Sequence, residues 1–513
     1  MRASRAASGL LTRTEHRIRP DASRTLGRLF VPGHETLIRG GSRALAVIDR
    51  ILDLNEQEVD YTLARTLARF SAGYRDLAET LELNFQLVAH RVGAEIEVAS
   101  ARRQLIGAYF THEYALEAAA LFNPSIVIHP DQADCQLGEA RFIMSLRAVG
   151  EGHLSSIEFR TGTIGGDAQI RFDLPGRFLD TGHTRSVPYD RNLFEKKLTE
   201  LGQDDENAQL LWSILPPRFT AAELNVALAE LSSQQVTRAD STALVDRVRW
   251  MAASNYAVEF GEHHSLPERV LWPVGPAESH GMEDARFVRF TDGADTIYYA
   301  TYTAFDGSQV APHLLETTDF RTFTISQLSG PSASNKGMAL FPRRIAGRYV
   351  ALSRWDRESN AIAYSDDAHE WSEGRTVQSP THPWELIQLG NCGSPIETPA
   401  GWLVFTHGVG PMREYAIGVA LLDLDQPERV MATLPEPLLV ADASEREGYV
   451  PNVAYSCGSM THGGTVVLPY GCSDSSVRIA LVDLGLLLER LAATRPDGLP
   501  PRPVRACVAG CPR

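Results

Sequence analysis

The sequence predicts a mainly β protein, a propeller that carries a helical N-terminal region and a helical insertion. Short apolar runs such as "RFIMSLRAV", "TIYYATYTAF" and "WLVFTHGV", divided by Gly, Asp and Pro, recur after residue 122. A loose repeat sets a strand beside an acidic turn at 314–323, 362–371, 419–430 and 479–491. This period of roughly 50–60 residues is typical of four-stranded blades with long loops. The β part has room for about five or six such blades, and a β-sandwich is the rival architecture.

Apolar residues at three- and four-residue spacing predict the helical parts. Residues 1–118 form a helical N-terminal region. Within it, 1–35 is rich in Arg and Ser and is expected to be a disordered tail, although its composition also fits an organellar transit peptide. The β domain spans 119–490 and is interrupted by a helical insertion at about 190–255. Residues 491–513 are expected to be a C-terminal tail.

The charge balance argues against a nucleic-acid partner. The formal net charge is −15 and the pI is about 5.5, with no basic stripe in the body of the chain. Nucleic-acid binding usually needs such a stripe, so a neutral or locally bound substrate is expected. The six cysteines are scattered and typical of reduced thiols. No apolar run approaches the ~18 residues of a membrane span. We therefore expect a cytoplasmic protein with no membrane partner.

The segment "ESHGMEDARF" concentrates charge in a few residues. It holds Glu283, Asp284 and Arg286 directly before the strand "FVRF", so it is a loop that enters a strand and not a surface helix. Two adjacent carboxylates beside a cation are an arrangement that can prepare a general acid. A structural Asp–Arg turn is an equal alternative.

Other polar residues could meet this segment at the centre of a propeller. Cations that suit a phosphate or a sugar hydroxyl flank an apolar strand pair, and polar groups occupy later Gly-rich loops. The alternative for all of them is ordinary surface polarity. These residues are Lys336 and Arg354, then Asn391, Glu397 and His407, then Glu445, Arg446, Asn452, Tyr470 and Asp474. The pair His263–His264 has no third ligand at metal spacing, so no metal is expected.

Taken in order, several blocks resemble glycoside hydrolase family 130, which comprises the five-bladed β-mannoside phosphorylases and β-1,2-mannosidases. They are "GMEDARF", "TYTAFDG", "NKGMALFPRRIAGRYVALSR", "SPIETPAGWLVFTHGV", "GVALLDLDQPERVM" and "SEREGYVPNVAYSCGS…YGCSDS". The resemblance spans roughly 122–484, apart from the insertion, and leaves 1–118 uncovered. It implies a five-bladed β-propeller.

The resemblance also implies a mechanism. Asp284 matches the catalytic acid, which protonates the glycosidic oxygen through a sugar hydroxyl. Inorganic phosphate, a co-substrate and not a cofactor, attacks the anomeric carbon from the opposite face and gives α-mannose 1-phosphate with inversion. The implied phosphate ligands are Lys336, Arg354, His407 and Arg147. The implied substrate-binding residues are Asn123, Glu283, Arg286, Asp306, Asn391, Tyr470 and Asp474.

One position departs from the family pattern. Many of the phosphorylases have "PIKT" where this chain has "PIET", which places Glu397 at a lysine position. A carboxylate there would repel phosphate and suit the activation of water, so the leading prediction, an inverting β-mannoside phosphorylase, has a rival. The rival is an inverting β-1,2-mannosidase with Glu397 as base. A non-catalytic carbohydrate-binding propeller is a third hypothesis. The expected partner is an oligosaccharide, and the N-terminal helices could mediate a homo-oligomer.

Overall fold

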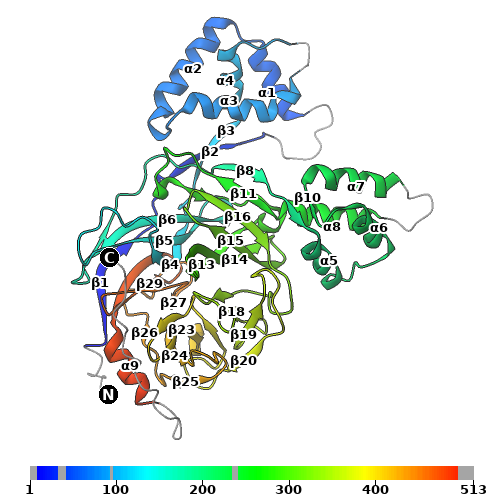
Figure 1. Cartoon of the computed structure of the whole chain (residues 1–513). Helices are drawn as coiled ribbons and strands as arrows, with labels where there is room; N and C mark the ends of the chain where they lie inside the picture. Colours follow the sequence, from blue (N-terminus) through cyan, green and yellow to red (C-terminus); the bar gives the residue numbers. More distant parts are fainter. Residues whose placement is uncertain (1–8, 33–41, 93–95, 234–240, 495–513) are drawn as a thin grey trace.

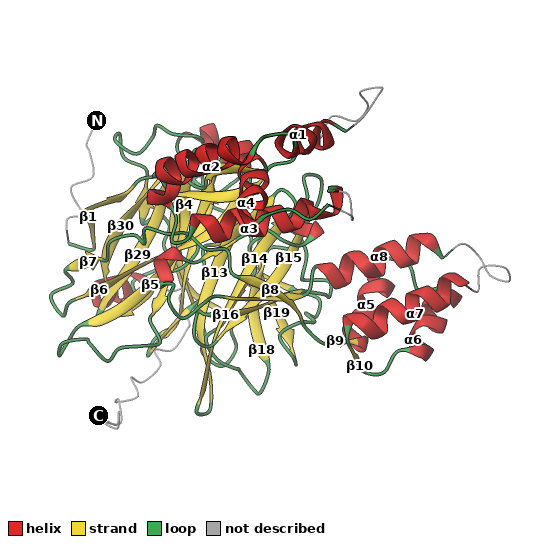
Figure 2. Cartoon of the chain, turned by 90° about the horizontal axis from the view of Figure 1, so that it is seen from above, coloured by secondary structure: helices red, strands yellow, loops and turns green. Residues whose placement is uncertain are grey.

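The computed structural model describes residues 9–32, 42–92, 96–233 and 241–494, and it confirms a mainly β fold. Figures 1 and 2 show a body of β-sheets with two separate groups of helices beside it. One group belongs to the N-terminal region and the other to the insertion. The chain thus adds two helical units to a β body.

The N-terminal helices are α1 (Arg43–Leu52), α2 (Glu56–Phe70), α3 (Leu77–Val88) and α4 (Ser100–Tyr109). Asn55 starts α2 with a capping box, in which its side chain accepts from the Glu58 amide and the Glu58 carboxylate accepts from the Asn55 amide. Apolar residues from all four helices pack into a small core, which includes Ile48, Phe85 and Ile106. The predicted helical region up to 118 is wrong after Tyr109, where the chain turns into a strand.

The first residues of the chain are not a disordered tail where they are described. β1 (Leu11–Ile18) pairs antiparallel with β30 (Ser476–Asp483), and β2 (Thr25–Leu29) pairs with β3 (Thr111–Ala115). The expectation of disorder over 1–35 is therefore wrong for these two segments. The physical reason is edge pairing, because β30 would otherwise expose unpaired backbone groups. Residues 1–8 and 33–35 lie outside the described part.

The insertion folds around its own core. It contains α5 (Arg191–Glu200), α6 (Glu206–Ile214), α7 (Ala221–Ser233) and α8 (Thr242–Ala253), with the short strands β9 (Tyr189–Asp190) and β10 (Arg218–Phe219). Phe194, Leu211, Leu228 and Val248 are buried in this core. The insertion therefore has a core of its own, and the strands before and after it, β8 (His183–Ser186) and β11 (Tyr256–Glu259), belong to one sheet.

The strands form several antiparallel groups. The eleven-stranded sheet runs β4 (Ala120–Ile128), β5 (Ala140–Val149), β6 (Ser155–Ile164), β13 (Gly281–Asp292), β14 (Asp295–Phe305), β15 (Val310–Thr317), β16 (Thr322–Gln327), β11 (Tyr256–Glu259) and β8 (His183–Ser186), with β7 (Ile170–Phe172) and β12 (Val270–Leu271) paired to β6. A four-stranded sheet runs β17 (Ala339–Leu340), β18 (Tyr349–Ser353), β19 (Asn360–Ser365) and β20 (Arg375–Gln378). A six-stranded sheet holds β21 (Gln388–Asn391), β22 (Ile396–Thr398), β23 (Gly401–Val409), β24 (Tyr415–Leu422), β25 (Val430–Thr433) and β26 (Leu439–Val440). A five-stranded sheet holds β1, β30, β29 (Thr465–Cys472), β27 (Ala454–Tyr455) and β28 (Met460–His462).

Hydrogen-bond pairing within the described residues closes none of these sheets on itself. The strand expected near 479 is β30, and the rest of the predicted β domain up to 490 is helical. Asp483 caps a C-terminal helix, α9 (Leu484–Ala492), by accepting from the Leu486 amide at 2.8 Å. Leu487 and Leu491 of α9 pack into the core of the last two sheets, so the region before 490 does not end as a strand.

Several strands of the largest sheet meet at one edge, which we call the site edge. Ala120 at the start of β4 pairs with Val149 at the end of β5, and Val149 also pairs with Ser155 at the start of β6. Gly281 at the start of β13 pairs with Ser155 and with Phe305, the last residue of β14. Side chains a few residues inward from this edge are thereby brought close together.

Candidate active site

Two buried polar residues near the site edge sit in irregular positions of their strands. The pairing of β13 with β14 shifts register between Glu283 and Arg286, and Asp284 inside this shift has φ of 57°. The pairing of β4 with β5 shifts between Phe122 and Ser125, and Asn123 there has φ of 50°. Bulges re-aim side chains, and left-handed backbone at a non-glycine residue is a strain that often marks function.

The two bulges aim Asn123 and Asp284 at each other. Asn123 Nδ2 donates to Asp284 Oδ1 at 2.7 Å, and Arg147 Nη1 lies 3.3 Å from the same oxygen. Burial by itself raises the pKa of Asp284. The charges of Arg147, Arg286 and Lys336 and the Asn123 hydrogen bond outweigh burial and lower the pKa to about 2. Asp284 is therefore a buried carboxylate in a strongly positive setting.

Glu283 bridges two cations at the same site. Arg147 Nη2 donates to Glu283 Oε1 at 2.7 Å, and Lys336 Nζ donates to Glu283 Oε2. Lys336 belongs to the loop between β16 and β17, so Glu283 ties this loop to β5 and β13. The carboxylate fixes where the two positive charges lie.

The guanidinium of Arg286 is hydrogen-bonded within the fold, and Arg286 does not line the pocket described below. Its guanidinium donates to the Cys392 carbonyl at 2.9 Å, to the Asp284 carbonyl at 2.8 Å and to the Tyr455 hydroxyl at 2.7 Å. It is 1% exposed. The structure therefore gives Arg286 a positioning role for the Asp284 bulge in place of the predicted contact with substrate.

Arg354 and His407 form a second polar pair. Arg354 Nη1 and His407 Nε2 are 2.8 Å apart. Burial, followed by the charges of Arg354 and Arg286, lowers the pKa of His407 well below its usual value, so the imidazole is neutral. Nε2 then accepts from Arg354, and Nδ1 donates to the Asn391 carbonyl at 3.2 Å. His407 thus orients Arg354.

One nitrogen of Arg354 is left over. Its Nε is buried and has no hydrogen-bond partner among the described residues, and no carboxylate there pairs with the guanidinium. A buried, unpaired donor is costly to leave unsatisfied. The group is therefore suited to an anionic or hydroxyl-bearing ligand.

Asp284 and the cations around it line one cavity of about 250 Å³, which we call the site pocket, whereas the predicted ligands Glu283 and Arg286 lie behind its wall. It is lined by Phe122, Asn123, Arg147, Asp284, Lys336, Arg354, Gln388, His407, Arg413, Tyr415, Tyr449, Val450, Val453, Tyr455 and Asp474. Asp474 has the opposite setting from Asp284, because burial and the charge of Asp284 raise the pKa of Asp474 to about 6. The pocket thus holds two carboxyl groups with well separated proton affinities.

Sequence reasoning missed several lining residues. Gln388, Arg413, Tyr415 and Tyr449 come from loops and strand ends that look like ordinary polar sequence. "GPMREY" carries a usable signal only in the structure, where Arg413 has φ of 58°. Tyr449, in the segment "SEREGYVPN", is 57% exposed at the pocket.

Glu397 lies outside the site pocket, which corrects its predicted place beside the phosphate. Its carboxylate binds Arg343 at two points, 2.7 Å and 2.8 Å, near the surface. Glu397 of β22 is opposite Trp402 of β23, whereas Gly390 of β21 is opposite His407 of β23. The five residues from Trp402 to His407 separate the two positions by about 17 Å along an extended strand. Glu397 therefore lies beside the end of β23 that is far from His407.

Three further predicted substrate ligands also point elsewhere. The Tyr470 hydroxyl donates to Glu445 Oε1 at 2.6 Å inside the last sheet. Asp306 accepts from the Ser308 and Gln309 amides at 2.8 Å and 2.6 Å, which closes a turn. Asn391 is buried behind His407, and its side-chain atoms have no partner among the described residues. None of the three lines the site pocket.

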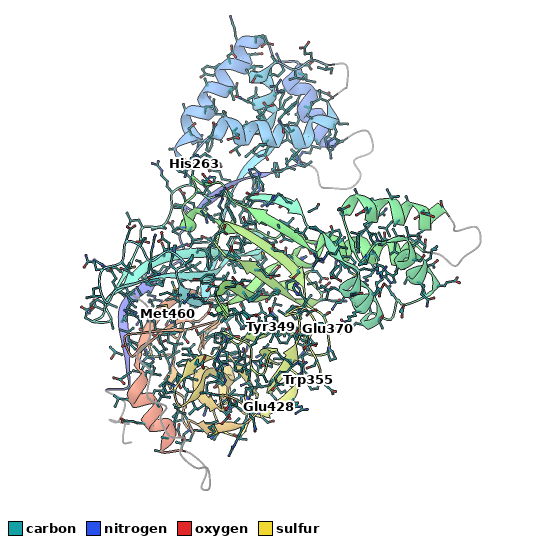
Figure 3. The ribbon with its side chains drawn as sticks, viewed as in Figure 1. His263, Tyr349, Trp355, Glu370, Glu428 and Met460 are labelled. Atoms are coloured by element: carbon teal, nitrogen blue, oxygen red, sulfur yellow. The ribbon has the colours of Figure 1, made fainter. Side chains whose placement is uncertain are left out.

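No set of three or more His, Cys, Asp and Glu side chains within the described residues is arranged to hold a metal ion. His264 contacts Asp180 at 3.1 Å, and Figure 3 places its neighbour His263 at the end of the β body next to the N-terminal helices. In the described part of the chain, no helix combines the length and apolar character needed to cross a membrane.

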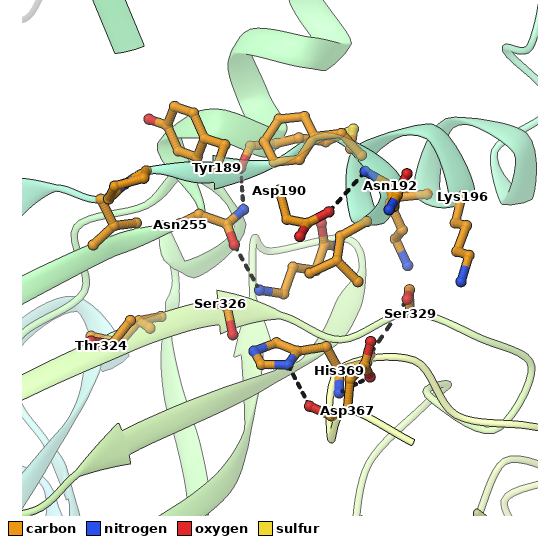
Figure 4. A pocket seen from close by; sticks show the side chains of 18 of the residues that line it. Tyr189, Asp190, Asn192, Lys196, Asn255, Thr324, Ser326, Ser329, Asp367 and His369 are labelled. Atoms are coloured by element: carbon orange, nitrogen blue, oxygen red, sulfur yellow. Dashed lines mark hydrogen bonds between the residues drawn. The ribbon is translucent and has the colours of Figure 1, made fainter. Parts of the chain in front are cut away.

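A larger cavity, of about 680 Å³, lies between the insertion and β16 (Figure 4). Its charges are mostly paired, as Lys196 is with Glu370 and as His369 Nε2 is with Glu316 Oε1 at 3.3 Å. Asp190 caps α5 by accepting from the Asn192 amide at 2.9 Å (Figure 4). Of these contacts, the Lys196–Glu370 pair joins the insertion to the β body, and none of them contains a residue of the site pocket.

Comparison with known proteins adds an independent line of evidence. A family model described as beta-1,4-mannooligosaccharide phosphorylase matches residues 250–492. The 1,2-beta-oligomannan phosphorylase of Thermoanaerobacter sp. (strain X514) is 32% identical over 216 residues, which cover 40% of this chain and 70% of that protein. The beta-1,2-mannobiose phosphorylase of the same organism is 34% identical over 250 residues, which cover 46% of this chain and 79% of that protein.

Solved structures give a more distant likeness. The beta-1,2-mannobiose phosphorylase from Listeria innocua is 22% identical, with a TM-score of 0.43, over 73% of this chain and 92% of that chain. The family model begins at residue 250, so the N-terminal helices and nearly all of the insertion lie outside it.

Proposed function

The chain belongs to glycoside hydrolase family 130 and is a glycoside phosphorylase or hydrolase of that family, and we propose that it is an inverting β-mannoside phosphorylase. It cleaves β-mannosides with inorganic phosphate, gives α-mannose 1-phosphate, and works in both directions. The relatives named above are phosphorylases of β-mannosides, which supports this substrate class. Phosphate is a co-substrate, and no cofactor is proposed.

We propose that the strands form five blades around the site pocket. The groups are β4–β7, β13–β16, β17–β20, β21–β26 and β27–β30 with β1. The site pocket draws its lining from all of them, which is what a central channel would do. The eleven-stranded sheet would then hold the first two blades side by side.

The buried and unpaired Nε of Arg354 is the observation that carries the choice of phosphate. Phosphate is a dianion near neutral pH, and a guanidinium binds it through parallel N–H bonds. Lys336 and Arg147 add two further cations to the same pocket. With Arg413, four cationic side chains line this small cavity, which suits a phosphate far better than a neutral sugar.

Asp284 is proposed as the general acid. Its pKa of about 2 means that it is ionised in the protein alone. A bound phosphate would offset the positive charges that lower this pKa, so the carboxyl would regain its proton affinity when both substrates are present. The proton then passes to the glycosidic oxygen through a sugar hydroxyl while phosphate attacks the opposite face. Asp474 and Asn123 are proposed to hold sugar hydroxyls.

The position of Glu397, which lies beside the far end of β23 and is paired with Arg343, supports the phosphorylase over a hydrolase that uses Glu397 as its base. A non-catalytic sugar-binding protein would not need two carboxyl groups in the pocket with pKa values shifted in opposite directions, as those of Asp284 and Asp474 are. We also propose a cytoplasmic location, in keeping with the four described cysteines, which are free thiols.

The test is to incubate the protein with β-1,2- and β-1,4-mannobiose, with and without phosphate, and to identify the products. Mannose 1-phosphate that forms only with phosphate is the expected result. Free mannose without phosphate would establish the hydrolase. Asp284→Asn is expected to lower the turnover about 10²- to 10⁴-fold, the usual contribution of a general acid. Turnover unchanged in this variant would overturn the assignment of Asp284.

A further inference from the structure

Besides the site pocket and the cavity of Figure 4, a third cavity of about 470 Å³ lies between the insertion and the loops at the site edge. We call it the insertion groove. The insertion contributes Lys197 from α5, Leu201 directly after α5, and Arg247 and Trp250 from α8. The β body contributes residues 306–312, 327–328 and 333–335, together with Arg357. The groove is thus made jointly by the part of the chain that matches the family model and the part that does not.

The groove lies at the same edge as the site pocket. β15 begins at Val310, which pairs with Phe305 at the site edge, and β16 ends at Gln327, which pairs with His313 of β15. The loop that leaves β16 leads to Asn335 and Lys336. Asn335 lines the groove and Lys336 lines the site pocket. The two cavities are therefore lined by neighbouring residues of one loop.

The insertion is anchored to this same loop. Lys197 Nζ donates to the Leu328 carbonyl at 3.3 Å, and the Gly330 amide donates to Glu200 Oε1. Lys196 pairs with Glu370 of the neighbouring sheet. These contacts hold α5 next to the loop that leads to Lys336, so one wall of the groove is anchored at the site edge.

The site pocket is too small for an oligosaccharide. Its volume of about 250 Å³ lies just below the ~300–1,000 Å³ range of pockets for drug-sized ligands. An oligosaccharide therefore cannot lie wholly inside it. Any sugars beyond the scissile bond must leave the pocket along its rim, and the groove next to Lys336 is a ready path.

We propose that the insertion groove binds the sugars of an unbranched β-mannooligosaccharide that follow the scissile bond, and so selects for longer substrates. The inference rests on the proposed function. The lining of the insertion groove suits the chemistry of a sugar chain. Trp250 offers an aromatic surface. Gln309, Asn335 and Arg357 offer planar hydrogen-bonding groups. Arg357 Nε donates to Asn335 Oδ1 at 2.8 Å, which fixes both groups.

Arg247 completes the surface. It lies one turn before Trp250 on the same face of α8, with its guanidinium carbon 5.7 Å from the centre of the Trp250 ring. Trp250 is partly buried against the cores of both the insertion and the β body. The groove therefore depends on the insertion being docked.

The experiment compares mannobiose with mannotetraose, in both the β-1,2 and β-1,4 series, in phosphate-dependent assays of the full chain. The variants are Arg247→Ala and Arg357→Ala, whose side chains are at least partly exposed, and Trp250→Leu. Arg249→Ala is the matched control, because Arg249 is on the same helix, exposed and outside the groove. Melting temperatures identify any variant that fails to fold.

We expect the groove variants to raise the KM for mannotetraose about 5- to 10-fold, the effect of losing one or two good contacts. In these variants the kcat/KM for mannobiose should stay within about twofold of that of the unaltered protein. In Arg249→Ala, the KM for mannotetraose and the kcat/KM for mannobiose should both stay within about twofold. Equal effects on the two chain lengths, or no effect on either, would overturn the groove proposal. If the unaltered protein cleaves neither substrate in the presence of phosphate, the proposed function itself fails.

Discussion

Arg343 holds Glu397 in a two-point ion pair, with Nε 2.8 Å from Oε2 and Nη2 2.7 Å from Oε1. The pair is near the surface, with side chains 38% and 43% exposed. Arg343 also lies over Trp402, its guanidinium carbon 4.8 Å from the ring centre. The one residue that departs from the phosphorylase pattern is thus committed to the far end of β23.

Replacement of Glu397 by Gln is therefore expected to leave phosphorolysis within about twofold of the unaltered rate, because an exposed ion pair contributes only about 0–1 kcal/mol. The melting temperature should change little for the same reason. Initial rates of mannose 1-phosphate release measure the first effect, and thermal unfolding measures the second. A loss of turnover by two orders of magnitude would place Glu397 in the reaction after all.

Replacement of Arg354 by Lys should weaken phosphate binding. Lysine keeps the charge but loses the planar fork and the unpaired Nε, so phosphate loses parallel hydrogen bonds. We expect the KM for phosphate to rise about 10- to 100-fold, which corresponds to one or two charge-assisted hydrogen bonds. The KM for the mannoside should change much less.

Arg343→Lys is the matched control, since it makes the same substitution at a surface pair outside the site pocket. It should leave the KM for phosphate unchanged. If Arg354→Lys raised both substrate KM values to the same degree, Arg354 would be a structural residue and not a phosphate ligand.

Asp474 should make the protein less stable as the pH rises. Its pKa in the folded protein, about 6, is above the ordinary value of 3.8, because burial and Asp284 disfavour its charge. The folded state therefore holds this proton more tightly than the unfolded chain does. Its contribution to stability is fully present below about pH 4 and is lost as the pH rises through 6.

Asp474→Asn removes this loss. We expect the variant to be more stable than the unaltered protein at pH 7.5, by up to about 3 kcal/mol, and equally stable at pH 4. Urea unfolding at the two pH values gives the comparison. Equal stability at pH 7.5 would mean that Asp474 is ionised without cost. Activity should fall, since the amide cannot accept from two sugar hydroxyls as a carboxylate does.

The positions of the site residues could be predicted only as far as the order of the blocks allowed. The pocket brings together Asn123, Arg147, Asp284, Lys336, Arg354, His407 and Asp474, which come from segments up to 351 residues apart. Motif order carried this information, because local pattern does not show which loops meet. The misplaced residues share one cause. Glu397 and Tyr470 lie in strands next to site segments, and sequence does not show which end or face of a strand a polar side chain takes.

The fold shows a similar division. The alternation of β-like runs predicted a mainly β chain, whereas the pairing of β1 with β30 joins residues more than 450 positions apart and leaves no local signal. The helical insertion was visible from its periodicity, but its anchoring to the segment 328–330 was not. Long-range pairing and docking depend on tertiary contacts that no window of sequence contains.

A buried cluster of four charges offers a test of how the N-terminal segment is held to the β body. Arg24 Nε lies 2.8 Å from Glu117 Oε1, and Arg24 Nη2 lies 2.7 Å from Glu158 Oε2. Arg160 contacts both carboxylates. All four side chains are less than 10% exposed. Burial, followed by the charge of Glu158, raises the pKa of Glu117 to about 7.

Arg24→Met should destabilise the protein by about 3–5 kcal/mol, because it leaves two buried carboxylates with a single arginine. The loss should be smaller at pH 5 than at pH 8, since a protonated Glu117 no longer repels Glu158. Arg185→Met is the matched control. Its partner Glu259 is 3.0 Å away, but the two side chains are 57% and 38% exposed, so the expected cost is only about 0–1 kcal/mol. Urea unfolding at both pH values distinguishes the two sites, and equal costs for the two variants would show that the cluster does not fasten the N-terminal segment.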